Sequence, residues 1–238
     1  MIRRRKIGLI LPVSGSEPPP EAARMYPHID FIARSLGLKT MNQQGYDSVV
    51  DRIGEVAAEL AAERPDALTL IGTSLSFYRG AAFNEEIVEA IRQATGLPCT
   101  SMSTAVLEGL RAVGGRRLAV ATAYIDDVNA RLGRFLDESG FEVASMRGLS
   151  IEISGTAWRV TDAELIELGK RAAREAEGAD ALLVSCGGLR TLDIARPLED
   201  ATGLPVVSSM PAALWAAARL VGDSGRAPEF GRLLEQGA

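Results

Sequence analysis

The stretch that decides the fold is Ala181-Leu182-Leu183-Val184-Ser185-Cys186-Gly187-Gly188-Leu189-Arg190-Thr191-Leu192. Its apolar run, residues 181–184, has the length of a buried strand and is bounded by Asp180 and by the glycines. We predict a strand that ends at a cysteine, a tight turn on Gly187 and Gly188, and a helix that starts after the turn. Because glycine has no Cβ, the backbone N–H groups of this turn can approach a ligand closely.

Cys186 would then lie beside free backbone donors and near the positive end of a helix dipole. Such surroundings are one way in which a protein makes a thiol reactive. The alternative is a buried structural cysteine, because free cysteine is among the most buried residue types. Both interpretations remain open on this stretch alone.

Predicted strands and helices alternate on both sides of this stretch. The strands are expected at residues 6–12, 67–71, 97–100, 117–123, 141–147, 181–184 and 204–207. The helices are expected at residues 45–63, 83–94, 103–111, 124–138, from the capping-box pattern at 161–164, around 198, and at 211–221. Residues 72–76 are predicted to be a loop, and the segment from 222 a loose polar tail. Alternation of this kind predicts parallel sheets with right-handed crossovers.

The chain also repeats itself. Ala94-Thr95-Gly96-Leu97-Pro98 recurs at 201–205, the run from Ser101-Met102 is answered by Ser209-Met210, and the junction Ile71-Gly72-Thr73 is answered by Val184-Ser185-Cys186. The predicted fold class is therefore α/β, with two similar parallel-sheet halves related by a pseudo-twofold axis and the active site in the cleft between them. We place the first half at residues 1–114 and the second at 115–208, with 209–238 packing back on the first half.

Ligands bind at the carboxyl ends of strands in such sheets. The loops after Pro12, Ile71, Ala123 and Ser185 are therefore expected to line the cleft. Residues 14–21, with three consecutive prolines, form a loop long enough to suggest a function.

Composition excludes several classes of protein. A formal net charge of -5 argues against a nucleic-acid partner, and no apolar run is long enough to span a membrane. Two cysteines are too few for a disulfide scaffold, so both are expected to be reduced thiols in the cytoplasm. A single histidine, His28, leaves no histidine-based metal site, and none is predicted.

Three long runs carry a resemblance to a known family. They are Gly72-Thr-Ser-Leu-Ser-Phe-Tyr-Arg-Gly-Ala-Ala-Phe-Asn84, Ala121-Thr-Ala-Tyr-Ile-Asp-Asp-Val-Asn129 and Leu183-Val-Ser-Cys-Gly-Gly-Leu189. They resemble the arylmalonate decarboxylases of the aspartate/glutamate racemase superfamily. The resemblance implies a lyase that needs no cofactor and removes CO2 from disubstituted aryl or alkenyl malonates to give one enantiomer of a 2-aryl or 2-alkenyl acid, R by resemblance. Its partner would be a small-molecule dicarboxylate, and a monomer is compatible with the sequence.

The same resemblance implies roles for particular residues. Cys186 would be the catalytic acid that protonates one face of an enediolate. The enediolate would be held in a dioxyanion hole of Thr73, Ser74, Tyr124, Gly187 and Gly188. Preorganised donors of this kind contribute strongly, because removing one typically costs about 2.7–4 kcal/mol of transition-state stabilisation. The substrate pocket would comprise Pro12, Leu38, Met41, Tyr46, Gly72 and Leu75. Ser154 and Ala157 stand where the family has larger apolar side chains, which leaves the substrate range open.

Each of these residues also has a plain structural interpretation. Thr73 and Ser74 could be helix caps, Tyr124 an aromatic at the edge of the core, and the pocket residues ordinary packing. Cys99 lies inside a predicted strand and is expected to be structural. Whether the helix terminus or the surroundings dominate the thiol pKa stays open.

Two other functions remain as alternatives. A racemase or isomerase of the same superfamily would act on amino acids, hydantoins or maleate, but those reactions typically use two cysteines and Gly72 replaces one. A non-catalytic small-molecule binding protein on the same scaffold would bind without turnover. A pyridoxal-phosphate or nucleotide enzyme lacks its motifs in this sequence.

Overall fold

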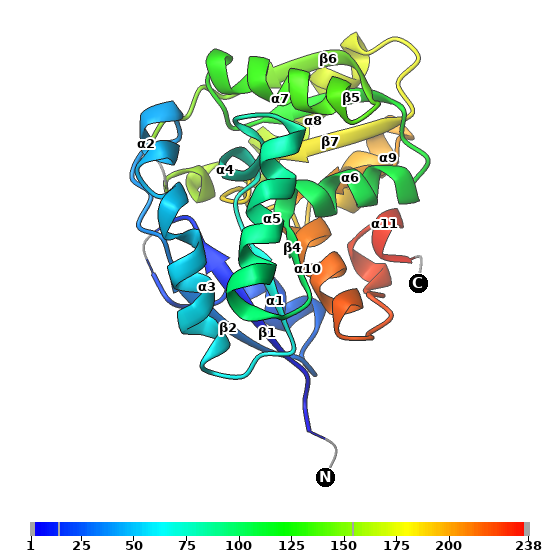
Figure 1. Ribbon diagram of the computed structural model, residues 1–238. Coiled ribbons are helices and arrows are strands. Elements are labelled where there is room, and N and C mark those ends of the chain that lie inside the picture. The colour runs from blue at the N-terminus through cyan, green and yellow to red at the C-terminus, as the bar shows by residue number, and fades with distance from the viewer. Residues whose placement is uncertain (1–2, 14, 154, 236–238) are drawn as a thin grey trace.

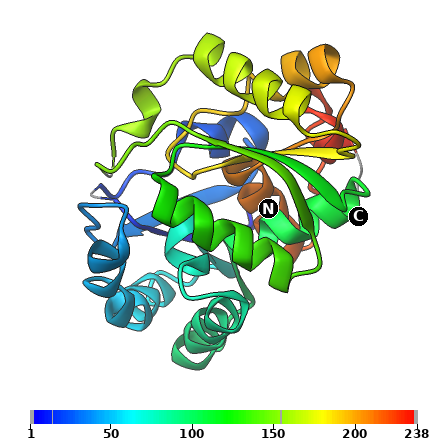
Figure 2. The same cartoon turned by 90° about the horizontal axis from the view of Figure 1, so that it is seen from above.

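The computed structural model describes residues 3–13, 15–153 and 155–235, and it contains two four-stranded parallel sheets (Figures 1 and 2). The first sheet has the order β2-β1-β3-β4 and the second the order β6-β5-β7-β8. The strands are β1 (Lys6–Leu11), β2 (Asp30–Ser35), β3 (Ala67–Leu70), β4 (Cys99–Ser101), β5 (Arg117–Thr122), β6 (Glu142–Gly148), β7 (Ala181–Ser185) and β8 (Val206–Ser208). The repeated strand order confirms the predicted α/β fold with two similar halves.

Helices cover the two sheets (Figure 1). The α-helices are α1 (Pro20–Met25), α2 (Gln43–Asp47), α3 (Ile53–Ala61), α4 (Thr73–Phe77), α5 (Ala81–Thr95), α6 (Met102–Ala112), α7 (Asp126–Glu138), α8 (Asp162–Glu175), α9 (Ala195–Thr202), α10 (Ser209–Leu220) and α11 (Arg232–Glu235). Three 3₁₀ turns are η1 (Val50–Arg52), η2 (Ala157–Arg159) and η3 (Pro228–Phe230). None of the helices in the described ranges combines the length and apolarity needed to cross a lipid bilayer.

The central strands β3 and β7 are buried along their whole length, as their apolar runs predict. The predicted capping box also forms at α8: the Thr161 hydroxyl accepts from the Glu164 N–H, and the Glu164 carboxylate accepts from the Thr161 N–H at 2.8 Å. Helix α10 contacts β3, β4 and α6 of the first half and β8 of the second. It therefore packs against the sheets of both halves.

The sheet register refines the repeat seen in the sequence. Leu70 pairs with Ser101 in the first sheet, and Val184 pairs with Ser208 in the second. Gly72 and Cys186 each come two residues after these paired positions, so they are structural counterparts. The predicted match of Ser101 with Ser209 was wrong by one residue, because letter identity was followed rather than hydrogen-bond register. The run match that sets Gly72 against Ser185 is also displaced by one residue, whereas the pairing of Gly72 with Cys186 that the resemblance implied agrees with the register.

The predicted helix at 45–63 is broken into α2, η1 and α3. The Ser48 hydroxyl donates to the Gly45 carbonyl at 2.6 Å, and the β-branched pair Val49-Val50 follows directly. Both features compete with a regular helix at this point.

Several other boundaries were predicted wrongly. Residues 73–77 form helix α4 rather than a loop, and α6 is capped by Ser101, whose hydroxyl accepts from the Thr104 N–H at 3.0 Å, rather than by Ser103. Helix α7 starts at Asp126, two residues later than predicted. The tail is not loose, because it forms η3 and α11, and α11 buries Leu233 and Leu234.

Candidate active site

A cavity of about 650 Å³ lies at the carboxyl ends of strands from both sheets. Ten of the predicted site residues line it: Pro12, Leu38, Met41, Gly72, Thr73, Ser74, Leu75, Cys186, Gly187 and Gly188. Tyr46 and Tyr124 are not among the lining residues and are fully buried. The proline-rich loop contributes Gly15 to Glu17 and Pro19 to Glu21. The loop after Ala123 contributes no described lining residue, and Gly155, Ala157 and Trp158 line the cavity instead.

Cys186 has a buried thiol that keeps its proton. Its side chain is 4% exposed, and its sulfur accepts from the Gly188 N–H at 3.4 Å. Burial raises the pKa of the Cys186 thiol to about 11, against the weaker opposing effect of the Gly188 and Leu189 N–H groups. The thiol is therefore neutral near pH 7.

The helix predicted directly after this turn is absent, because α9 begins only at Ala195. The intervening residues form turns, in which the Leu189 N–H donates to the Cys186 carbonyl at 3.2 Å. Consecutive glycines disfavour helix here. The dipole expected to lower the thiol pKa is consequently missing, and burial decides the direction of the shift.

Gly72 and Cys186 share an unusual backbone conformation, with φ of +156° and +159° respectively. A Cβ built on Gly72 would lie 3.4 Å from the Leu75 Cβ and 3.4 Å from the Pro12 Cγ, which are ordinary contacts. The first half therefore has room for a small side chain where the second half carries its thiol. Only the second half supplies a sulfur at this junction.

A buried hydroxyl network joins the two junctions. The Thr73 hydroxyl donates to the Ser209 Oγ at 2.9 Å, and the Cys186 N–H donates to the same oxygen at 3.2 Å. The Thr73 carbonyl in turn accepts from the hydroxyls of Ser76 and Ser103, each at 3.0 Å. Ser209 thus links the positions of Thr73 and Cys186. Sequence reasoning missed Ser209, although its place directly after a strand in the repeated segment was a usable signal.

Two tyrosines lie behind the lining residues. The Tyr124 hydroxyl is 3.3 Å from the Ser185 Oγ, whereas the buried Tyr46 hydroxyl has no hydrogen-bond partner among the described residues. Burial raises the pKa of both tyrosines, and the nearby Cys186 adds to the effect. Both hydroxyls are therefore protonated and able to donate.

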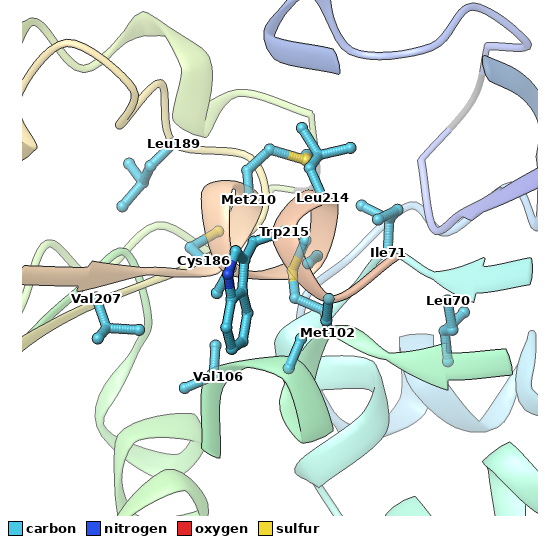
Figure 3. Packing of buried hydrophobic residues seen from close by; sticks show 14 of the residues in the cluster. Leu70, Ile71, Met102, Val106, Cys186, Leu189, Val207, Met210, Leu214 and Trp215 are labelled. Carbon is cyan, nitrogen blue, oxygen red and sulfur yellow. The ribbon is translucent and has the colours of Figure 1, made fainter. Parts of the chain in front are cut away.

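The floor around Cys186 is apolar and tight. Figure 3 shows Met102 from α6 and Met210 from α10 with Ile71, Leu189 and Cys186. A Cβ on Gly187 would come within 2.9 Å of the Met102 sulfur, so a larger residue there would displace the methionine. The close approach of backbone to side chain explains why glycine stands at this position.

The rim of the cavity is formed by a loop of the second half that is tied to the first half. Thr40 and Ile153 form an isolated antiparallel bridge, and the Met41 N–H donates to the Glu152 carbonyl at 2.9 Å. Ala157, one of the two residues expected to affect substrate range, is buried and lines the cavity. Ser154, the other one, lies outside the described residues.

Cys99 lies apart from this cavity. It is buried in β4, and its thiol donates to the Val88 carbonyl at 3.3 Å. Across the described parts of the chain, no three His, Cys, Asp or Glu side chains are grouped as metal ligands.

The duplicated fold and a cavity with a single protonated cysteine define the class. The duplicated fold is that of the aspartate/glutamate racemase superfamily, and one cysteine, instead of the two that its racemases and isomerases typically use, points to the decarboxylases. The family model described as arylmalonate decarboxylase matches residues 7–234, and the chain belongs to that family. It is therefore an enzyme, a decarboxylase.

Individual relatives agree with this assignment. The chain is 48% identical over 231 residues to the arylmalonate decarboxylase of Bordetella bronchiseptica, covering 97% of this chain and 96% of that protein. A crystal structure of a double mutant of arylmalonate decarboxylase in the liganded form matches with a TM-score of 0.95 at 47% identity, covering 97% of this chain and 99% of that chain. A maleate isomerase from Pseudomonas putida S16, crystallised with maleate, matches with a TM-score of 0.91 at 21% identity over 98% of each chain and thus shares the fold.

Proposed function

We propose that the enzyme decarboxylates disubstituted malonates that carry an aryl or alkenyl group, without a cofactor, and releases one enantiomer of the acid. The observation that carries the proposal is the asymmetry of the two junctions. One holds the protonated thiol of Cys186, and its counterpart, Gly72, has no proton to give. The 48% identity to a protein named arylmalonate decarboxylase supports the choice of substrate class.

In the proposed reaction, the bond between the α-carbon and one carboxylate breaks and CO2 leaves. The electron pair spreads into the remaining carboxylate as an enediolate. The hydroxyls of Thr73 and Ser74 and the N–H of Gly187, which all line the cavity, would donate to its two oxygens, and the Thr73 hydroxyl would turn from Ser209 to do so. The Tyr124 hydroxyl lies behind these residues, so it would join them only after its side chain had moved toward the substrate.

Cys186 would then pass its proton to one face of the α-carbon and become a thiolate. The Gly188 N–H, which already donates to the sulfur, would stabilise that thiolate. A proton from solvent restores the thiol and balances the reaction. Because the thiol has a pKa of about 11, it still carries its proton near pH 7 when the enediolate forms. The enediolate is basic enough to take the proton from this weak acid.

The carboxylate that leaves as CO2 would occupy the apolar part of the cavity. Leu38, Met41, Leu75 and Pro12 line the cavity, and they offer no hydrogen-bonding side chain. A charge that is poorly solvated there favours loss as neutral CO2, an effect commonly described as ground-state destabilisation.

The test is CO2 release from 2-methyl-2-phenylmalonate by purified protein treated with a chelator, with the product resolved on a chiral phase. We expect CO2 and one enantiomer at a rate unaffected by the chelator. Folded protein that releases no CO2 would contradict the proposal. Ligand binding without turnover, retained in Cys186→Ala, would instead identify a binding protein.

A racemase or isomerase activity is not favoured, because Gly72 leaves one face of the substrate carbon without a thiol. We further propose that the protein works in the cytoplasm, where its two free cysteines would stay reduced.

A further inference from the structure

The rim of the cavity carries opposing charges. Of the described residues that line the cavity, Arg190 is the one cation, whereas the exposed Glu17 and the buried Glu21 bring two carboxylates. The malonate of the proposed function is a dianion, and the whole chain has a formal net charge of -5. Without Arg190, the charged side chains that line the cavity among the described residues would all be carboxylates.

Arg190 is held in place by an aromatic ring rather than by an acid. Its guanidinium carbon lies 5.3 Å from the centroid of the Trp158 ring, which is 50% exposed and lines the same cavity. No ion pair among the described residues involves Arg190. This cation–π contact favours one position of the Arg190 side chain at the rim, where no acidic partner among the described residues neutralises its charge.

We propose that Arg190, stacked on Trp158, is a positioning residue that draws the dianionic substrate past Glu17 and Glu21 and lowers KM without changing the chemical step. The inference rests on the proposed function for its substrate. Arg190 is four residues from Cys186 along the chain, yet it lies at the exposed rim while Cys186 is buried. An interaction at the rim acts on capture of the substrate and not on proton transfer.

A matched control exists on the same ring. The Arg159 guanidinium carbon is 5.6 Å from the Trp158 centroid, but Arg159 is not among the described residues that line the cavity. Arg159→Gln removes the same charge from the protein as Arg190→Gln, and it removes a stacking partner from the same tryptophan. A difference between the two variants therefore reports the position of the charge.

The experiment measures kcat and KM for 2-methyl-2-phenylmalonate over a range of ionic strength. One charge acting on a dianion through water at about 7 Å changes kcat/KM about five- to tenfold at low salt. We expect Arg190→Gln to lose this factor through KM, Arg190→Glu to lose about its square, and Arg159→Gln to stay within about twofold. The differences should vanish near 1 M salt, where the screening length is about 3 Å.

The inference is overturned if Arg190→Gln and Arg159→Gln behave alike at low salt, or if the loss is in kcat and independent of salt. Should the protein release no CO2, calorimetric titration with benzylmalonate keeps the two proposals apart. This dianion has no aryl group on the reacting carbon to stabilise a carbanion. If the wild type binds benzylmalonate in a salt-sensitive way and Arg190→Glu binds it more weakly, the role of Arg190 is supported although the proposed reaction has failed. If the wild type and Arg190→Glu bind benzylmalonate equally, or if neither binds it, the role of Arg190 is refuted.

Discussion

The kcat of this enzyme should fall only at an unusually high pH, because burial raises the pKa of Cys186 to about 11 from the 9.0 of an ordinary thiol. At pH 10, a group with a pKa of 11 is about nine-tenths protonated, whereas a group with a pKa of 9 is about one-tenth protonated. If Cys186 is the acid, kcat should still be near its maximum at pH 10. The rate would fall only as the pH approaches 11.

The same shift makes a prediction about stability that does not depend on the reaction. The pKa is raised in the folded state, so its contribution is fully present below about pH 9 and is lost as the pH rises through about 11. The full loss is about 3 kcal/mol, and about half of it has occurred by pH 10. Cys186→Ser removes the titrating thiol, so its stability should fall less than that of the wild type between pH 7 and pH 10.

Two assays measure these effects. One is kcat from pH 6 to 10.5, and the other is urea unfolding of both proteins at pH 7 and pH 10. Burial is the larger cause of the raised pKa of the buried tyrosines and is common to both proteins, whereas the smaller effect of Cys186 on Tyr46 and Tyr124 is lost in Cys186→Ser and adds to the expected difference. A decline of kcat with an apparent pKa at or below 9 in folded enzyme, or equal pH sensitivity of the two proteins, would refute the reasoning.

Three substitutions test the site further. Cys186→Ser should keep the fold and lose about 10²- to 10⁴-fold in kcat, since a hydroxyl is a weaker acid than a thiol; activity within tenfold of wild type would remove Cys186 from the mechanism. Gly72→Cys should fold, because Cys186 already adopts the same φ, and should drive the product toward the racemate; unchanged enantiomeric purity would show that residue 72 does not face the α-carbon. Ser209→Ala should lower the free energy of unfolding by about 1–3 kcal/mol, because the Thr73 hydroxyl and the Cys186 N–H lose their partner; unfolding in urea measures it, and an unchanged midpoint would mean that water replaces the hydroxyl.

Much of the architecture could be predicted because it depends on local pattern. Runs such as 181–184 are apolar throughout, and their short length and flanking glycines indicate buried strands, while the copy of 94–98 at 201–205 exposes the duplication. Pairing registers depend on hydrogen bonds between distant strands, which letters do not reveal. For this reason the match of Ser101 with Ser209 was displaced by one residue.

The site was predictable where its residues follow strands directly. Gly72 to Leu75 and Cys186 to Gly188 come from two junctions of this kind, and the structure brings them to one cavity. Ser209 and the rim pair of Trp158 and Arg190 were not predicted, because each contributes to the site through a contact with a residue far away in the sequence. The pKa of Cys186 could not be predicted for another reason, because it depends on how completely the fold buries the thiol away from water.

The bridge between Thr40 and Ile153 also restricts the motion that would open the cavity. It ties the loop that carries Ala157 and Trp158 to the other half of the molecule through the main chain. Widening the mouth by parting the halves must break the hydrogen bond from the Met41 amide to the Glu152 carbonyl. The rate at which the Met41 amide hydrogen exchanges with deuterium therefore reports how often the cavity opens, and a bound ligand that keeps the cavity closed would slow this exchange.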